Sequence, residues 1–158
     1  MECKKSMAIE MDINTGILTI NDKYEIRPLM TWDEVANSNL VELMVDFSKK
    51  KIEEKDTGVF LLKTEVDGET LAIDMDLYDK LLRITLTIDP KGISECYHSN
   101  NLGGLDIILL KNYDLMDKLV GVGRMNYYHF NWGYAEFKSG YRDFNIGVLI
   151  RYRTKGVI

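Results

Sequence analysis

Between residues 58 and 89 the hydrophobic and polar positions alternate with a period of two, which is typical of β-strands that bury one face. Asp67-Gly68 is a strong signal for a two-residue hairpin turn, and Asp79-Lys80 marks a second turn. Pairing across these turns sets apolar residues opposite each other: Phe60 with Met75, Leu62 with Ile73, Met75 with Ile84, Ile73 with Leu86 and Leu77 with Leu82. Both hairpins give one apolar face, and a slip of one residue would destroy it. The segment is therefore predicted to be an antiparallel meander.

Shorter alternating stretches occupy the first thirty residues and predict strands near 9–13, 17–20 and 24–26. The sequence Thr31-Trp32-Asp33-Glu34 has the form of a capping box, in which Thr31 and Glu34 bond to each other's backbone amides. A short helix is therefore predicted over about 32–37. Residues 40–55 fit both a helical stripe and a strand, and helix is the favoured interpretation.

Apolar residues recur at helical spacing between 102 and 120, and Gly121 follows as a stop signal. A helix is predicted there, with a break near Asn112. The polar residues 91–101 before it predict a loop.

The last 32 residues hold nine of the chain's sixteen aromatic residues. They predict a hairpin over 127–153, with a loop at 139–142 that sets Phe137 opposite Phe144 and Lys138 opposite Asp143. One face of this hairpin holds small and apolar residues: Gly133, Ala135, Phe137, Phe144, Ile146, Val148, Ile150 and Tyr152. The opposite face holds aromatic residues beside arginines: Phe130, Trp132, Tyr134, Leu149, Arg151 and Arg153.

Two interpretations of this second face are open. Aromatic residues and arginine dominate binding hot spots, which predicts a binding surface at Phe130, Trp132, Tyr134, Arg151 and Arg153. In that case Trp132→Ala would weaken partner binding and leave the melting temperature nearly unchanged. In the other interpretation the aromatic residues fill the core, because a bulge at Gly133 would turn Phe130 and Trp132 inward.

The order of elements predicts an α+β fold. It consists of a curved antiparallel sheet with one or two helices on one face, built from the meander 58–89, the C-terminal hairpin 127–153 and the N-terminal strands. The length predicts one domain over 1–158, with residues 1–6 frayed. No signal peptide is recognisable, and no stretch approaches the ~18 consecutive apolar residues of a transmembrane helix.

Candidate chemistry is sparse. Cys96 and His98 are the one thiol and imidazole close together in sequence, and with Tyr97 and His129 they define an alternative pocket. Three metal ligands at most come from Cys96, His98 and His129, without the usual spacing, so no metal or other cofactor is predicted. Asp74, Asp76 and Asp79 resemble a carboxylate cluster, but strand alternation explains Asp74 and Asp76 as a solvated face, where Asp76 pairs with Arg83. Enzyme activity is thus the less favoured hypothesis.

The net charge of −5 argues against nucleic-acid binding, which depends on phosphate neutralisation by Lys and Arg. Two cysteines far apart, Cys3 and Cys96, do not indicate a disulfide framework, so a reducing cytoplasm is expected.

The end of the chain resembles that of small uncharacterised bacterial proteins. The matching positions are Trp132-Gly133, Asp143 and the Ile-x-Val-x-Ile-x-Tyr strand from Ile146 to Tyr152. The opening Gly16, Ile26, Pro28, Thr31 and Glu34 is also similar. The resemblance implies a small α+β fold in a bacterium and carries no established activity. Many small acidic proteins of this kind belong to toxin–immunity loci, which adds that idea by analogy.

Three functional hypotheses follow. The favoured one is a non-enzymatic cytoplasmic binding protein, immunity-like, that contacts a protein partner through a sheet face or acidic loops. The alternative is a small-molecule-binding or catalytic domain with a sheet–helix pocket near Cys96 and His98. The third is self-association through an exposed edge strand near Arg151.

Overall fold

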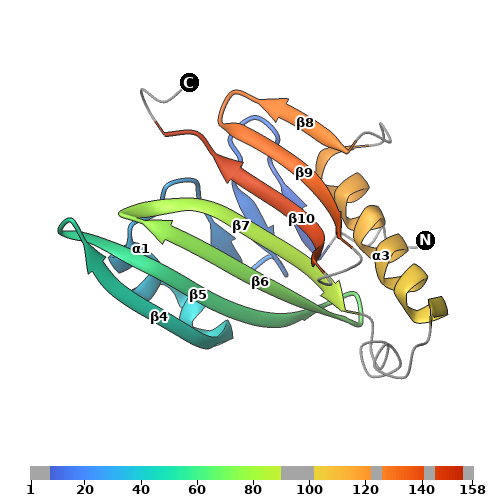
Figure 1. Cartoon of the computed structure of the whole chain (residues 1–158), viewed down its shortest axis with the longest axis horizontal. Helices are drawn as coiled ribbons and strands as arrows, with labels where there is room; N and C mark the ends of the chain where they lie inside the picture. Colours follow the sequence, from blue (N-terminus) through green and yellow to red (C-terminus); the bar gives the residue numbers. More distant parts are fainter. Residues whose placement is uncertain (1–7, 90–101, 122–125, 141–144, 155–158) are drawn as a thin grey trace.

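The computed structural model describes residues 8–89, 102–121, 126–140 and 145–154, and over these residues the chain has an α+β fold (Figure 1). The large sheet is antiparallel and contains, in spatial order, β4 (Met44–Ile52), β5 (Lys55–Val66), β6 (Glu69–Tyr78), β7 (Lys80–Asp89), β10 (Asn145–Tyr152), β9 (Gly133–Gly140) and β8 (Tyr127–Phe130). The small sheet contains β1 (Ile9–Met11), β2 (Leu18–Ile20) and β3 (Tyr24–Ile26). The helices are α1 (Trp32–Ala36), the 3₁₀ helix η1 (Asn39–Leu43) and α3 (Leu102–Val120).

The two sheets and the helices form layers around one large buried cluster, and Ile108 and Ile146 form a second, small one. The small sheet, α1, η1 and α3 lie on one side of the large sheet, and Figure 1 shows the other side open, covered by none of the described elements. Leu62, Ile73 and Ile84 meet in the interior, as the meander predicts. The N-terminal strands form a sheet of their own instead of extending the large one.

The predicted meander is confirmed nearly residue for residue. Leu62 pairs with Ile73, and Ile73 pairs with Leu86. The one difference is Leu77, which pairs with Leu81 instead of Leu82, because the ladder is irregular after Asp76. Asp79 adopts a positive φ of 70°, which closes a turn one residue shorter than predicted.

The capping box is also confirmed. The Thr31 hydroxyl accepts from the Glu34 amide at 3.1 Å, and the Glu34 carboxylate accepts from the Thr31 amide at 2.9 Å. The helix favoured for 40–55 is wrong beyond η1, because β4 follows it from Met44. A strand forms there because β5 supplies a pairing partner over its whole length, with Phe47 opposite Phe60.

The helix α3 runs without the predicted break at Asn112, so that prediction is wrong. Asn112 is fully buried, and its side chain faces the end of β7. Its Oδ1 accepts from the Ile88 amide at 2.7 Å, and its Nδ2 donates to the Ile88 carbonyl at 2.9 Å. The asparagine therefore attaches the helix to the sheet.

The C-terminal hairpin forms, but in a different register. Phe137 pairs with Val148 and Lys138 with Gly147, so the predicted partners Phe144 and Asp143 are wrong. The aromatic segment also divides into two strands, because Asn131-Trp132 is a turn between Phe130 and Gly133. Since β10 lies between β7 and β9, the predicted edge strand near Arg151 is wrong as well.

Trp132 joins this turn to the connection between β1 and β2 of the small sheet. Its Nε1 donates to the Ile13 carbonyl at 2.9 Å, and its indole stacks on the Phe130 ring with centroids 4.9 Å apart. A Cβ on Gly16 would lie 2.7 Å from the indole, so glycine leaves the room that Trp132 fills. Behind it, the buried Tyr152 hydroxyl donates to the Gly16 carbonyl at 3.3 Å.

Candidate functional site

The open side of the large sheet, hereafter the uncovered face, carries two rows of side chains that run across all its strands. Strand pairing places one row in the order Ser48, Val59, Asp76, Arg83, Arg151, Tyr134 and His129. The next row is Asp46, Leu61, Asp74, Thr85, Leu149, Glu136 and Tyr127. Polar and aromatic residues thus gather toward the β8 end.

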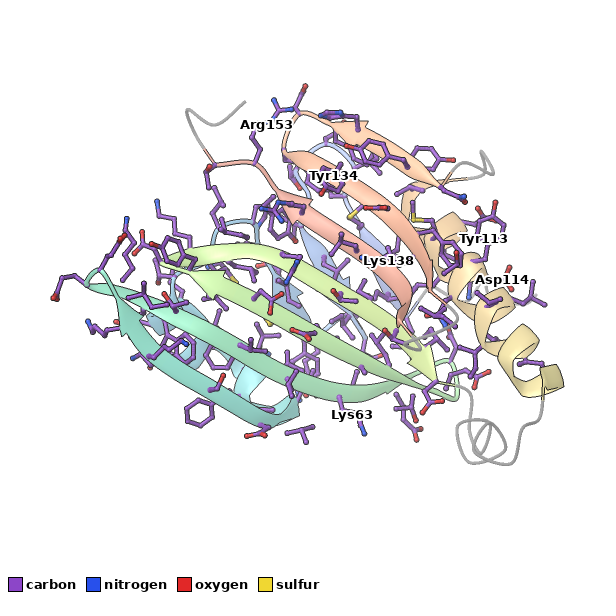
Figure 2. The ribbon with its side chains drawn as sticks, viewed as in Figure 1. Lys63, Tyr113, Asp114, Tyr134, Lys138 and Arg153 are labelled. Carbon is purple, nitrogen blue, oxygen red and sulfur yellow. The ribbon has the colours of Figure 1, made fainter. Side chains whose placement is uncertain are left out.

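At that end the uncovered face is hollowed into a groove of about 300 Å³. We call it the Tyr–Arg groove and define it by the residues Tyr127, His129, Tyr134, Arg151 and Arg153. The rings of Tyr127 and Tyr134 stack with centroids 5.0 Å apart. Figure 2 shows Tyr134 and Arg153 close to each other at this end of the sheet, far from Lys63 on β5.

Arg153 and His129 close one end of the Tyr–Arg groove. The Arg153 guanidinium lies 3.0 Å from His129 Nε2. A guanidinium only donates, so in this hydrogen bond Nε2 is the acceptor. This contact holds the two side chains together, and a neutral imidazole does not balance the arginine's charge.

Arg151 adds a second positive charge to the Tyr–Arg groove. It pairs across the strands with Arg83, whose own charge is balanced by Asp76 through an Nε–Oδ2 contact of 2.7 Å. Among the described residues, no carboxylate forms an ion pair with Arg151 or Arg153. The groove therefore presents two guanidinium groups, neither in an ion pair with a described residue, beside stacked tyrosines.

Sequence reasoning identified part of this site. Tyr134, Arg151 and Arg153 come together as predicted, but Phe130 and Trp132 pack toward the core on the other side of the sheet. The prediction that all five share one face is therefore wrong. Tyr127 was missed, and His129 was assigned to a different pocket. The turn at Asn131-Trp132 decides this, because it folds β8 back beside β9.

The alternative pocket expected at Cys96, Tyr97, His98 and His129 falls largely outside the residues that the structure describes. Cys96, Tyr97 and His98 lie outside the described residues, and His129 belongs to the Tyr–Arg groove. A cavity of about 320 Å³ does lie between α3 and the β5–β6 hairpin. Two ion pairs line it, Lys111 with Glu69 at 3.0 Å and Lys118 with Asp67 at 3.7 Å.

Among the described acids of the uncovered face, Asp74 has a strongly raised pKa. Burial raises its pKa to about 6, and the neighbouring charge of Asp76 adds to the effect. One Asp74 carboxylate oxygen is buried without a hydrogen-bond partner. Asp74 lies beside a shallow depression of about 410 Å³ in the middle of the sheet.

Within the described parts of the chain, no three His, Cys, Asp or Glu side chains are placed to hold a metal ion. The helices of those parts are too short or too polar to cross a membrane. No protein-family model matches the chain, and it has no significant match among curated proteins or solved structures.

Proposed function

We propose that the protein is a non-enzymatic binding protein that holds an acidic segment of a protein partner in the Tyr–Arg groove. The observation that carries this proposal is the pair of arginines, Arg151 and Arg153, which form no ion pair with a described residue and lie beside the stacked Tyr127 and Tyr134. Arginine binds carboxylates through two parallel hydrogen bonds, and tyrosine adds rigid contact area at little entropic cost.

The charge distribution supports the same partner chemistry. The whole chain carries a net charge of −5, whereas the Tyr–Arg groove is positive. An acidic segment would be repelled by most of the surface and attracted to this one place, which orients the encounter. Contact through acidic loops, the other route expected from the sequence, would require a basic partner.

The biological role and the compartment proposed for this binding are inferred from the sequence. The resemblance to small bacterial proteins and the overall acidity support an immunity-like role in a bacterial cytoplasm. In such a role the protein would cover a partner's surface and block it. A protein of this kind needs a preformed surface and no catalytic group.

The proposal is tested by affinity capture from a bacterial lysate at cell-like salt, with three versions of the chain. These are the wild type, Arg151→Glu and the charge-matched control Lys63→Glu. Both substitutions reverse one exposed positive charge on the uncovered side, but Lys63 lies on β5, away from the groove (Figure 2). A partner is expected to bind the wild type and the control and to be lost with Arg151→Glu.

Direct titration of the purified partner completes the test. Reversal of Arg151 is expected to weaken binding by roughly 10- to 100-fold, because it replaces an attraction with a repulsion at the contact. The loss should be smaller at high salt, since salt screens exposed charges. If no captured protein depends on Arg151, the Tyr–Arg groove is not the binding site.

A further inference from the structure

A second surface of the chain points to a different partner. β4 forms one edge of the large sheet, is nine residues long and pairs only with β5 among the described strands. Along such an edge, every second residue has its backbone N–H and C=O directed away from the sheet. Val45 and Phe47 on this strand are 63% and 55% exposed. Long exposed edges with apolar side chains are templates for pairing with another strand.

Lysines usually protect such an edge, and β4 carries three of them, Lys49, Lys50 and Lys51. Two of the three share one carboxylate within the chain. Lys49 and Lys51 lie 3.8 and 3.4 Å from the Asp56 carboxylate, and Lys49 also lies over the Trp32 ring. One carboxylate balances one of these two lysine charges, so the protecting charge of the edge is reduced but not removed.

The remaining two charges of β4 have opposite signs. Lys50 forms no ion pair with any described residue, and the Asp46 carboxylate accepts only from the Phe47 amide, at 2.8 Å. Both residues project on the uncovered face, where Asp46 pairs with Leu61 and Lys50 with Thr57. They lie two residues before and two residues after Ser48, which is the middle residue of the strand.

This spacing suits a symmetric pair of antiparallel strands. In a two-fold interface every contact occurs twice: if residue i of one copy contacts residue j of the other, then residue j of the first copy also contacts residue i of the second. With the two-fold axis at Ser48, Asp46 of each copy lies opposite Lys50 of the other, which gives two pairs of opposite charges. The same register sets Phe47 opposite Lys49, an arrangement that favours a cation–π contact.

Other registers are less favourable. An axis at Lys49 or Lys50 places that lysine opposite the same lysine of the second copy. An axis at Asp46 likewise places two aspartates opposite each other. Like charges directly opposite each other destabilise a sheet. An axis at Phe47 leaves Lys50 opposite Met44. Of these, only the axis at Ser48 pairs Asp46 with Lys50, and it does so within the part of β4 that lies beyond the irregularity between Met44 and Asp46.

We propose that two copies of the chain pair antiparallel along β4 about an axis at Ser48, which joins the two large sheets into one. The occupant of the β4 edge is thus a second copy of the same chain. The Tyr–Arg groove lies at the β8 end of the sheet, at the far edge from β4. Both grooves of the dimer therefore remain free, and the two proposals can fail independently.

The test is sedimentation velocity of the full chain over a wide concentration range. The wild type is expected to be a dimer that dissociates on dilution. Lys50→Asp and Asp46→Lys are each expected to raise the dimer dissociation constant about 10-fold or more, because each creates two like-charge pairs. Lys63→Asp, with the same charge change away from the edge, should leave the dimer intact.

Charge exchange distinguishes the proposed register from any general charge effect. The double variant D46K/K50D swaps the two charges, so opposite charges again face each other across the axis, and the dimer is expected to be restored. A mixture of the two single variants should form a mixed dimer for the same reason. All these positions are exposed on the edge strand, so circular dichroism should show unchanged folding.

A covalent test uses the residue on the axis. In chains with Cys3 and Cys96 changed to serine, Ser48→Cys should give a disulfide-linked dimer under mild oxidation, because residues directly opposite lie within disulfide range. Lys50→Cys should not. A wild type that stays monomeric at every concentration would overturn the proposal. A dimer unaffected by Lys50→Asp, or a double variant that stays dissociated, would do so too.

Discussion

The side chain of Asn112 makes to Ile88 the two hydrogen bonds that a neighbouring strand residue would make. Its amide oxygen accepts from the Ile88 N–H, and its amide nitrogen donates to the Ile88 carbonyl and to the Ile108 carbonyl in its own helix. At this end of the ladder between β7 and β10 the final pair is Leu86 with Val148, so Ile88 lies two residues beyond the paired region. Asn112 thus continues the sheet with a helix side chain.

Asn112→Ala should therefore lower the free energy of unfolding by about 2 to 4 kcal/mol, because a buried N–H and a buried C=O lose their partners. Urea denaturation measures this loss. Leu110→Ala, at an exposed position of the same helix, serves as the control and should change stability by less than about 0.5 kcal/mol. Equal effects of the two substitutions would contradict the role of Asn112.

Trp132→Ala should lower the free energy of unfolding by about 3 kcal/mol, because the indole packs on Phe130 and Tyr152 and fills the space beside Gly16. Trp132→Phe keeps most of this packing and loses the bond to the Ile13 carbonyl, so its cost should be about 1 kcal/mol. A melting temperature unchanged by Trp132→Ala would instead favour the binding interpretation of this residue.

Asp74→Asn should stabilise the protein near neutral pH. The folded-state pKa of Asp74 is about 6, above the ordinary value of 3.8, so between these pH values the folded chain binds more protons than the unfolded chain. Stability contributed by this group therefore falls as pH rises through that window. After allowance for its half-exposed position, the gain at pH 7.5 should be about 1 kcal/mol.

Denaturation of wild type and Asp74→Asn at several pH values measures this effect. The difference between the two should be small near pH 4, grow up to about pH 6 and then stay constant, as the raised pKa of Asp74 requires. Asp114→Asn removes an exposed carboxylate on α3 (Figure 2) and should show no such growth. A constant difference across the range would contradict the raised pKa of Asp74.

Gly133→Ala should be among the more damaging small substitutions. Gly133 has a φ of +154°, and a Cβ there would overlap the Arg151 carbonyl oxygen. The backbone must shift, at a cost of about 3 kcal/mol or more. Gly68→Ala provides a matched control, since its φ is also positive at +82° but nothing lies within 4 Å of a Cβ, so its cost should be about 1 kcal/mol.

The meander could be predicted because two independent signals agree. The period-two pattern sets the faces, and Asp67-Gly68 sets the register, which the observed Leu62–Ile73 pair confirms. Residues 40–55 lack such a turn signal and fit both periods. Pairing with β5 decides the outcome, and a partner strand cannot be recognised from the segment itself.

The candidate site was predicted in part because strand faces are insensitive to even shifts of register. Phe137 was expected opposite Phe144 and lies opposite Val148, a shift of four residues that keeps every side chain on its face. Tyr134 and Arg151 therefore project together as expected. The turn at Asn131-Trp132 could not be predicted in this way, because Trp132 is an unusual turn residue and its partners Ile13 and Gly16 lie more than a hundred residues earlier in the sequence.

The contacts of the small sheet have a consequence for synthesis of the chain. Trp132 bonds to Ile13 and Tyr152 to Gly16 across 119 and 136 residues. At typical translation rates, the ribosome needs roughly 6 to 24 s to add the 119 residues between the first two. During that time the core around Leu18, Ile20 and Ile26, which are fully buried in the finished fold, is incomplete. We therefore expect nascent chains to recruit chaperones through this first segment.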